Sequence, residues 1–489
     1  MISCGGTWAV GARGTIGPWM IRARGRDARV LGDPPGERAR AATDHGGRPG
    51  AGPPTWLQRA GRLRTVSRMS HPTRREFLSG VAGALAAAAP LGAVPSPRRP
   101  PAVGRPGVAA PRGAGPPWDF LVAGGTLYDA AQGIAARRDV AILDGTVAAV
   151  AERLPAERAR RVIDATDMIV TPGLIDVHVH VYPGVASLGI DADLAGIAKG
   201  VTTLIDAGSA GATTFAGFRR DVVQRARTRV YALVNMSRTG LTLSNELADP
   251  GYVDVAAVVA TIERNRDVAV GIKVRMLALA EGLDLEVMRR TREASDRAGV
   301  PVTVHIGGQT APLSRIIDFL RPGDVITHAL RRRGGILDGN GRVDPAVVEA
   351  VGNGIHLDVG HGMGNLDFDV AERVLDQGVL PSVISSDVHD GNAAGPVFDL
   401  PTTLSKLMML GMPLERVVEA ATATPARIFD LGYELGTLRV GAPADLAVFE
   451  LVERPYAFVD SSGNRRTGAQ RLAPYLALRD GFPYGVRRG

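Results

Sequence analysis

The stretch TPGLIDVHVHVYPG, residues 171–184, places His178 and His180 two positions apart in an apolar, β-branched run. Side chains alternate between the two faces of a strand, so residues two positions apart point in the same direction. A pair of this kind is compatible with two core or surface histidines, or with a metal site in which both imidazoles are ligands. The rest of the chain has to distinguish these two interpretations.

Strand-like runs alternate with amphipathic helical stretches from residue 168 onward. Eight such alternations in about 260 residues predict an α/β fold, a (β/α)8 TIM barrel over residues 168–431. A doubly wound open sheet is the alternative, but no G-x-G-x-x-G follows the first strand. The predicted strands are 168–180, 201–206, 230–235, 268–275, 301–306, 325–329, 355–359 and 382–387.

The segments on either side of the barrel are rich in short alternating runs with Gly and Pro turns. Residues 118–167 and 432–489 are therefore predicted to form one small β-sandwich domain from both ends of the chain.

Basic residues are concentrated at the N-terminus. Residues 1–117 hold 18 Lys and Arg against 5 Asp and Glu, whereas residues 118–489 hold 39 against 45. The pI of about 9.9 therefore reflects the leader and not the body of the protein, and no nucleic-acid partner is expected.

The N-terminal segments read as export and linker sequence. Residues 69–93 pair Arg74-Arg75 with a short apolar, Ala-rich run and resemble a twin-arginine signal peptide, which implies the twin-arginine translocase as a partner. Its apolar part is too short for a membrane helix, so no stable span is expected after cleavage, with an uncleaved anchor as the alternative. The protein is expected to be exported: periplasmic, cell-wall associated or secreted. Residues 1–68 are predicted to be a non-native or disordered extension, and residues 94–117 a Pro-rich disordered linker.

Chemically active side chains recur at the ends of the predicted strands, where barrel enzymes carry their active sites. Imidazole and carboxylate ligands without thiolates suit Zn²⁺, with Mn²⁺ or Co²⁺ as substitutes; the only cysteine is Cys4. The candidate metal ligands are His178, His180, Lys273, His305, His328 and Asp387.

Lysine is rare in this chain, which has only Lys199, Lys273 and Lys406 among its 57 basic residues. Two metals about 3.5–4 Å apart need bridging anions. A lysine that has taken up CO₂ as a carbamate supplies one, whereas arginine stays protonated. A bridging role would explain why Lys273 stands in a predicted central strand.

The motif PGLIDVHVH with this downstream series resembles the amidohydrolase superfamily, in the subtype with two divalent metals bridged by a carboxylated lysine. The segments VYPG, GVTTLIDAGSAGATTF, IKVRM, DVGHG and ISSDVHD are similar to deacetylase-like amidohydrolases related to dihydroorotases, and the resemblance runs from about residue 119 to the C-terminus.

The resemblance implies a division of roles among the candidate ligands. His178, His180 and Asp387 would hold one metal, and His305 and His328 the other. Carboxylated Lys273 and a hydroxide would bridge the two metals, with the hydroxide as nucleophile. Asp387 would be the catalytic residue, accepting the hydroxide proton and delivering it to the leaving group. The metal-site interpretation of the opening stretch is therefore preferred.

The sequence says less about the substrate-binding residues than about the metal ligands. Arg275 could bind a substrate carboxylate or form a structural ion pair, and His361 is a substrate-binding candidate by resemblance. Arg331, Arg332 and Arg333 lie in a Gly-rich loop after His328 that could recognise an anion or simply be solvated.

Three functions follow from these observations. The first is a metal-dependent hydrolase that cleaves an amide or ester acyl bond of a small carboxylate-bearing substrate, in the manner of a deacetylase. The second is a cyclic amide hydrolase of the dihydroorotase or hydantoinase type. The third is a non-catalytic scaffold relative, which would be expected to lose metal ligands. A homo-oligomer is left open.

Overall fold

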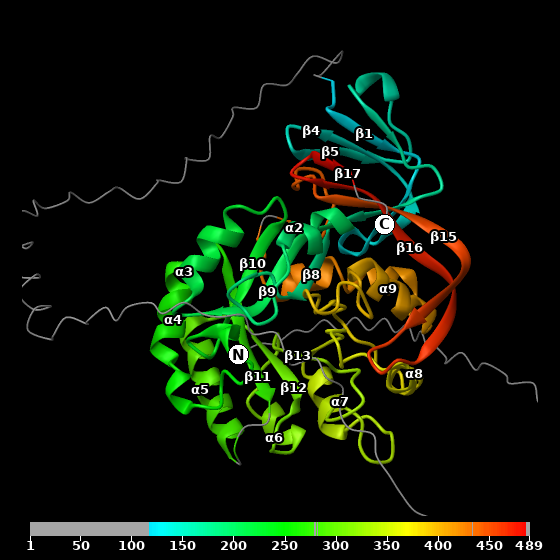
Figure 1. Cartoon of the computed structure of the whole chain (residues 1–489). Coiled ribbons are helices and arrows are strands. Elements are labelled where there is room, and N and C mark those ends of the chain that lie inside the picture. The colour runs from blue at the N-terminus through cyan, green and yellow to red at the C-terminus, as the bar shows by residue number, and fades with distance from the viewer. Residues whose placement is uncertain (1–116, 278–279, 281, 433, 486–489) are drawn as a thin grey trace, which may run out of the picture. The chain divides into compact units, whose positions relative to one another are not determined.

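A seven-stranded parallel sheet is the central element of the computed structural model (Figure 1). Its strands pair in the order in which they follow one another along the chain. They are β8 (Leu174–Val179), β9 (Val201–Gly211), β10 (Arg229–Asn235), β11 (Ala269–Leu277), β12 (Val302–Gly308), β13 (Val325–Thr327) and β14 (His356–Asp358). The α/β class is therefore confirmed, and seven of the predicted barrel strands have a counterpart in this sheet.

The segment predicted as the eighth strand, residues 382–387, is not a regular strand. Val383 forms a single parallel bridge to Asp358 of β14, and Val388, directly after the segment, forms one to Val179 of β8. Asp387 has a φ of 51°, a left-handed conformation that interrupts an extended ladder. The segment therefore lies between the two edge strands, and its distorted end carries Asp387.

The predicted first strand, residues 168–180, consists of two strands separated at Gly173. The N–H of Gly173 donates to the Asp445 carbonyl at 2.8 Å. A Cβ at Gly173 would lie 2.1 Å from the Thr202 hydroxyl, so only glycine fits this close approach. The first half, β7 (Ile169–Pro172), joins a different sheet, and only β8 belongs to the central one.

Helices connect the parallel strands, which cannot be joined by a tight turn; Figure 1 shows α3 to α7 on the outer side of the sheet. The Asp254 carboxylate accepts the N–H of Ala257 at 2.9 Å and caps the start of α4. Gly299, at φ 65°, ends α5. The helices are α2 (Ala192–Ala195), α3 (Phe215–Phe218, continued by a π-helix Arg219–Val223), α4 (Val255–Arg264), α5 (Leu283–Ala298), α6 (Leu313–Ile317), α7 (Pro345–Gly352), α8 (Phe368–Asp376), α9 (Leu400–Met409), α10 (Leu414–Glu419) and α11 (Ala423–Ile428).

Two smaller sheets flank the central one in the sequence; the six-stranded sheet combines strands from both ends of the described chain, and the four-stranded sheet contains only strands from residues 120–164. The four-stranded sheet has the order β5 (Thr146–Ala151), β4 (Asp139–Leu143), β1 (Phe120–Ala123), β6 (Val162–Asp164). The six-stranded sheet has the order β17 (Phe482–Gly485), β16 (Arg465–Arg479), β15 (Leu446–Val459), β7, β2 (Thr126–Asp129), β3 (Ile134–Arg137). Val122 and Val140 of the first sheet share a buried cluster with Val170 and Leu446 of the second. The early and late segments are thus packed around a common apolar cluster.

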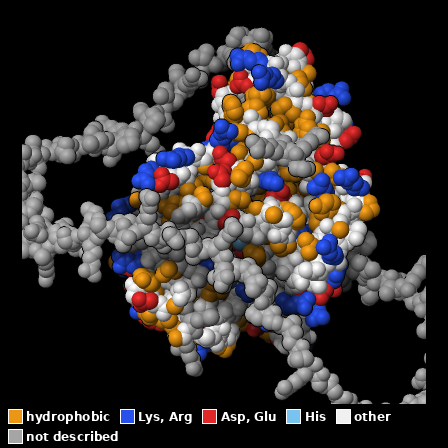
Figure 2. Space-filling view, viewed as in Figure 1, with side chains coloured by type: hydrophobic (Ala, Val, Ile, Leu, Met, Phe, Trp, Pro, Cys, Tyr) orange, Lys and Arg blue, Asp and Glu red, His pale blue; other side chains and the backbone are white. Residues whose placement is uncertain are grey.

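The structure describes residues 117–485, apart from 278–279, 281 and 433. The predictions for residues 1–68, 69–93 and nearly all of 94–117 lie outside this range. No helix within the described range is long and apolar enough to cross a membrane. On the face shown in Figure 2, positive and negative side chains are interspersed over the described surface.

Candidate metal centre

The side chains predicted as metal ligands lie at the carboxyl ends of the central strands, except Lys273, which lies in the middle of β11. They are His178 on β8 and His180 directly after it, Lys273 on β11, His305 on β12, His328 directly after β13, and Asp387 in the segment that bridges β14 and β8. All of them are buried except His305, which is partly buried. The strands therefore deliver donor atoms from five different places in the sequence to one end of the sheet.

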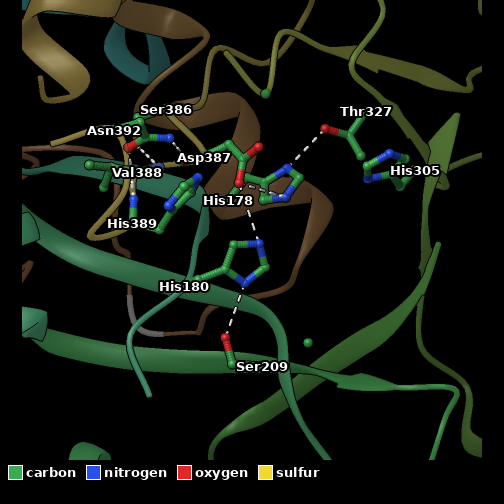
Figure 3. A network of polar contacts seen from close by, with 12 residues as sticks. His178, His180, Ser209, His305, Thr327, Ser386, Asp387, Val388, His389 and Asn392 are labelled. Carbon is green, nitrogen blue, oxygen red and sulfur yellow. Dashed lines mark hydrogen bonds and ion pairs between the residues drawn. The ribbon is translucent and has the colours of Figure 1, made fainter. Parts of the chain in front are cut away.

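Asp387 joins the two histidines of the opening motif. Its Oδ1 lies 3.3 Å from His180 Nε2 and 3.6 Å from His178 Nε2, and Figure 3 shows the carboxylate directed at both rings. One ligand atom from each of the three residues lies within 4.8 Å of the others. Two imidazole nitrogens and a carboxylate oxygen at this spacing are a donor set for a divalent metal.

Lys273, His305 and His328 extend this cluster. Lys273 Nζ lies 3.0 Å from His178 Nε2, and His305 Nδ1 lies 2.9 Å from His328 Nε2. The rings of His178 and His328 have centroids 4.9 Å apart. Each of the six predicted ligands is thus in contact with at least one other, and His178 links the two histidine pairs.

Two of these ligands have an unusual backbone conformation. His328 has a φ of 72° and Asp387 a φ of 51°, values that are uncommon for residues other than glycine. Such a conformation costs on the order of 1–3 kcal/mol and concentrates at functional sites. In His328 the left-handed conformation comes directly after β13, and in Asp387 it comes at the end of the segment that bridges β14 and β8. In both residues it turns the side chain toward the cluster.

The far nitrogen of each buried histidine is held by a polar partner. Thr327 donates its hydroxyl proton to Asp358 at 2.6 Å, so the Thr327 oxygen, 3.0 Å from His178 Nδ1, accepts from that ring. His328 Nδ1 donates to the carbonyl of Gly360 at 2.8 Å. In both rings the proton is therefore on Nδ1, and the lone pair of Nε2 is the one directed into the cluster, as a metal ligand requires.

These outer partners were not identified from the sequence. Ser209 lies 3.0 Å from His180 Nδ1, and Ser385 donates to Asp358 at 2.7 Å. The available signal was the presence of small hydroxyl residues at strand ends next to the candidate ligands. Hydroxyl groups are common in any loop, so the sequence gives no reason to select these.

Burial determines the charge of the cluster. It lowers the pKa values of His178, His305 and His328 well below the ordinary imidazole value, with nearby Lys273 adding to the effect. Burial also lowers the pKa of Lys273 to about 7, while Asp387 and Asp358 partly oppose the shift. The imidazoles of His178, His305 and His328 are therefore neutral, which is the state that binds a metal.

A comparison with known protein families supports the assignment of these residues to a metal centre. The model of the amidohydrolase family matches residues 169–469, which include all six predicted ligands. The chain belongs to the amidohydrolase family. It is therefore a metal-dependent hydrolase by family, as the sequence predicted.

Individual relatives of this amidohydrolase carry different names. A deacetylase from Agrobacterium fabrum is 37% identical over 327 residues, which cover 66% of this chain and 80% of the relative. A crystal structure described as an adenine deaminase is 32% identical, with a TM-score of 0.71 over 75% of this chain and all of that one. A second, described as a dihydroorotase, is 33% identical, with a TM-score of 0.70 over 76% and 98%.

The donor set of this amidohydrolase fits two divalent metals. Four imidazoles and a carboxylate converge with no thiolate among them, and Lys273 stands beside His178. Gly208, at φ 84°, makes room for Lys273, because a Cβ there would lie 2.7 Å from Lys273 Cβ. The chain thus places the lysine side chain among the histidines by omitting a side chain on β9.

Arg275, one of the two predicted substrate-binding residues, has a carboxylate partner within the protein. Its Nε and Nη2 donate to the two oxygens of Glu246 at 2.6 and 2.7 Å, and Glu246 is buried. This is the structural ion pair that the sequence left as an alternative. The assignment of Arg275 to substrate binding stays a prediction.

His361, the other predicted substrate-binding residue, is fully buried. Its Nε2 lies 2.7 Å from Lys406 Nζ. Burial lowers the pKa of His361 to about 3, and the charge of Lys406 adds to the shift. The neighbouring Gly362 lies against Asp387, since a Cβ there would be 2.2 Å from Asp387 Oδ2. His361 therefore borders the candidate centre, and its contact with substrate stays a prediction.

Proposed function

We propose that this amidohydrolase hydrolyses an amide or ester acyl bond of a small carboxylate-bearing substrate, in the manner of a deacetylase. The observation that carries the proposal is the convergence of His178, His180, Lys273, His305, His328 and Asp387 at the carboxyl end of one sheet. The name of the deacetylase relative supports an acyl substrate.

Two divalent metal ions, of which Zn²⁺ suits these donors best and Mn²⁺ or Co²⁺ are alternatives, would supply Lewis acidity and an activated water. His178, His180 and Asp387 would hold one ion, and His305 and His328 the other. The Nδ1 contacts of His178 and His328 would keep their Nε2 atoms directed at the ions.

Lys273 would bridge the ions as a carbamate. Its amine nitrogen forms a bond to the carbon of CO₂ and loses a proton, so the neutral amine is the reactive form. Burial lowers the pKa of Lys273 to about 7, and a substantial fraction of the amine is therefore neutral near physiological pH. The product is an anion in a position where a free ammonium would repel the metals.

Asp387 would move the proton. The carboxylate lies beside both histidines of one metal position and would accept a proton from the attacking water. The same carboxyl group would then donate that proton to the leaving nitrogen or oxygen as the acyl bond breaks. Asn392 donates to the Asp387 carbonyl at 2.8 Å and would hold the residue in place for both steps.

We also propose that the two smaller sheets form the β-sandwich predicted from the sequence, and that the protein is exported by the twin-arginine route. The common apolar cluster supports the first proposal. The Arg74-Arg75 segment supports the second.

A cyclic amide hydrolase is the second candidate function. It is favoured by the structural neighbour described as a dihydroorotase, at 33% identity over most of this chain. The same metal cluster would serve either reaction, because in both a water attacks a carbonyl carbon that is bonded to the leaving nitrogen or oxygen.

A substrate panel distinguishes the two candidates. The protein would be prepared with Zn²⁺ and bicarbonate and assayed with N-acetyl and O-acetyl carboxylic acids, dihydroorotate and hydantoins, with a chelator-treated sample as control. We expect metal-dependent release of acid from the acyl compounds. Ring opening alone would assign the protein to the cyclic amidase branch, and metal-independent or absent turnover of every compound would contradict the proposed function.

A further inference from the structure

Three cations lie beside the candidate centre. Lys273 Nζ is 3.0 Å from His178 Nε2, Arg275 pairs with His305 in the register of β11 and β12, and the N–H of Arg331 donates to the His328 carbonyl at 3.4 Å. Lys273 is a predicted metal ligand, and Arg275 is paired with Glu246. Arg331 forms no ion pair with any carboxylate in the described part of the chain; its Nη1 donates to the Ile306 carbonyl at 2.5 Å. It is therefore the cation at this site whose charge the described residues leave unbalanced.

The guanidinium of Arg331 lies over Gly307, at the carboxyl end of β12. A Cβ at Gly307 would be 2.0 Å from Arg331 Cζ and 2.3 Å from its Nε. Gly307 follows His305 by two positions at the point where the register between β11 and β12 shifts. The guanidinium thus takes the space that a side chain at Gly307 would need, at the carboxyl end of β12.

Glycines fix this position. Gly307 has a φ of 110°, and Gly334, at φ 62°, packs so closely that a Cβ there would lie 2.8 Å from Gly307 Cα. A Cβ at Gly335 would lie 3.1 Å from Arg331 Cγ. Any side chain at these positions would displace the arginine or the loop that carries it. The three glycines therefore leave space for the guanidinium of Arg331.

One donor of Arg331 is left without a partner. Its Nε is buried and makes no hydrogen bond with the described residues. Burying a cation with an unsatisfied donor is costly unless an anion is supplied. Neighbouring Arg332 differs, because its side chain is largely exposed and its Nε donates to Asp367 at 2.6 Å.

We propose that Arg331 binds the carboxylate of the substrate, at the end of β12 beside His305 and His328. A guanidinium pairs with a carboxylate through two parallel hydrogen bonds, and the substrate anion would supply the missing acceptor. This inference rests on the proposed function, which it deepens by naming the residue that selects acids over neutral acyl compounds.

The test compares an acid with its neutral analogue. Binding of N-acetylglycine and N-acetylglycinamide to the zinc-loaded full chain would be measured by NMR titration for the parent, Arg331→Met, Arg331→Lys and Arg332→Met. We expect the parent to prefer the acid, and Arg331→Met to lose about 10- to 100-fold in affinity for the acid only. Arg331→Lys should retain part of the preference, and Arg332→Met should keep all of it.

The outcomes separate this inference from the proposed function. No preference for the acid in the parent, or a preference that survives in a folded, zinc-loaded Arg331→Met protein, would overturn the role of Arg331. Equal weakening of acid and amide binding would assign Arg331 a structural role and overturn it as well. Failure of the proposed function shows instead as absent metal-dependent turnover in the substrate panel, whatever the titrations give.

Discussion

Lys273 Nζ lies 3.0 Å from His178 Nε2, although β11 and β8 are separated by two other strands in the sheet. Curvature of the sheet brings the two side chains together. Gly208 has no side chain, which leaves space for the side chain of Lys273. A buried amine in contact with an imidazole has no obvious structural purpose. It is explained if both groups are ligands whose metals would lie between them.

Replacing Lys273 with alanine should therefore remove metal as well as activity. We expect zinc to fall from two ions per chain to one or fewer. Turnover should fall by more than the roughly 100-fold that loss of an outer partner of a ligand costs. Elemental analysis of the zinc-loaded proteins, with turnover measured in parallel, checks both. Lys199→Ala is the control, since Lys199 is more exposed and pairs with Asp399 at 3.4 Å; full zinc content in Lys273→Ala would contradict the bridging role.

A substitution at Thr327 tests whether the hydrogen bond from His178 Nδ1 contributes to metal binding. Thr327→Val removes the oxygen that accepts from His178 Nδ1 while keeping the shape of the side chain. Loss of such a partner lowers metal affinity by about 10- to 100-fold, which a zinc titration against a competing chelator would measure. The matched control is Thr303→Val, because the Thr303 hydroxyl is buried without a hydrogen-bond partner among the described residues. Equal zinc affinities in the two variants would show that Thr327 does not orient His178.

Lys406 should make stability depend on pH. Burial lowers its pKa to about 7, although Asp399 and Asp460 oppose the shift, whereas the ordinary lysine value is near 10.5. Between these values the unfolded chain binds a proton that the folded chain does not, so stability rises with pH from about 7 to 10.5. Below pH 7 both states are protonated and the penalty is constant, at roughly 5 kcal/mol or less.

The Lys406→Met variant removes this dependence. Its free energy of unfolding relative to the parent should be most favourable near pH 7 and should decline toward pH 10. Urea unfolding of the metal-free proteins at several pH values measures the difference, and Lys199→Met reports the effect of removing a more exposed lysine. A difference that stays constant or grows with pH would show that the buried amine is charged throughout this range.

The sequence was sufficient to predict which residues lie at the strand ends, but not which partners each side chain contacts there. Alternation of strand and helix located the central strands, and parallel strands place their ends together, so His178, Lys273 and His305 could be grouped without coordinates. The irregular end of the last segment depends on the left-handed backbone of Asp387, which strand propensity does not reveal. The sequence singled out Arg275 for substrate binding and left Arg331 among three arginines of a Gly-rich loop, because only the fold shows that Glu246 pairs with Arg275.

Gly208 is the most specific test of how the fold positions Lys273. In Gly208→Ala the new Cβ would lie 2.7 Å from Lys273 Cβ and 2.9 Å from its Cγ, so the lysine must move away from His178. The matched control is Gly378→Ala, since Gly378 has a φ of 77° against 84° for Gly208 but nothing within 4 Å of the added atom. Both variants should lose about 1 kcal/mol of stability from the left-handed backbone. Only Gly208→Ala should also lose zinc, measured as ions per chain after loading. If the two variants retained the same zinc content, the close packing of β9 against Lys273 would not be what holds the amine in the metal centre.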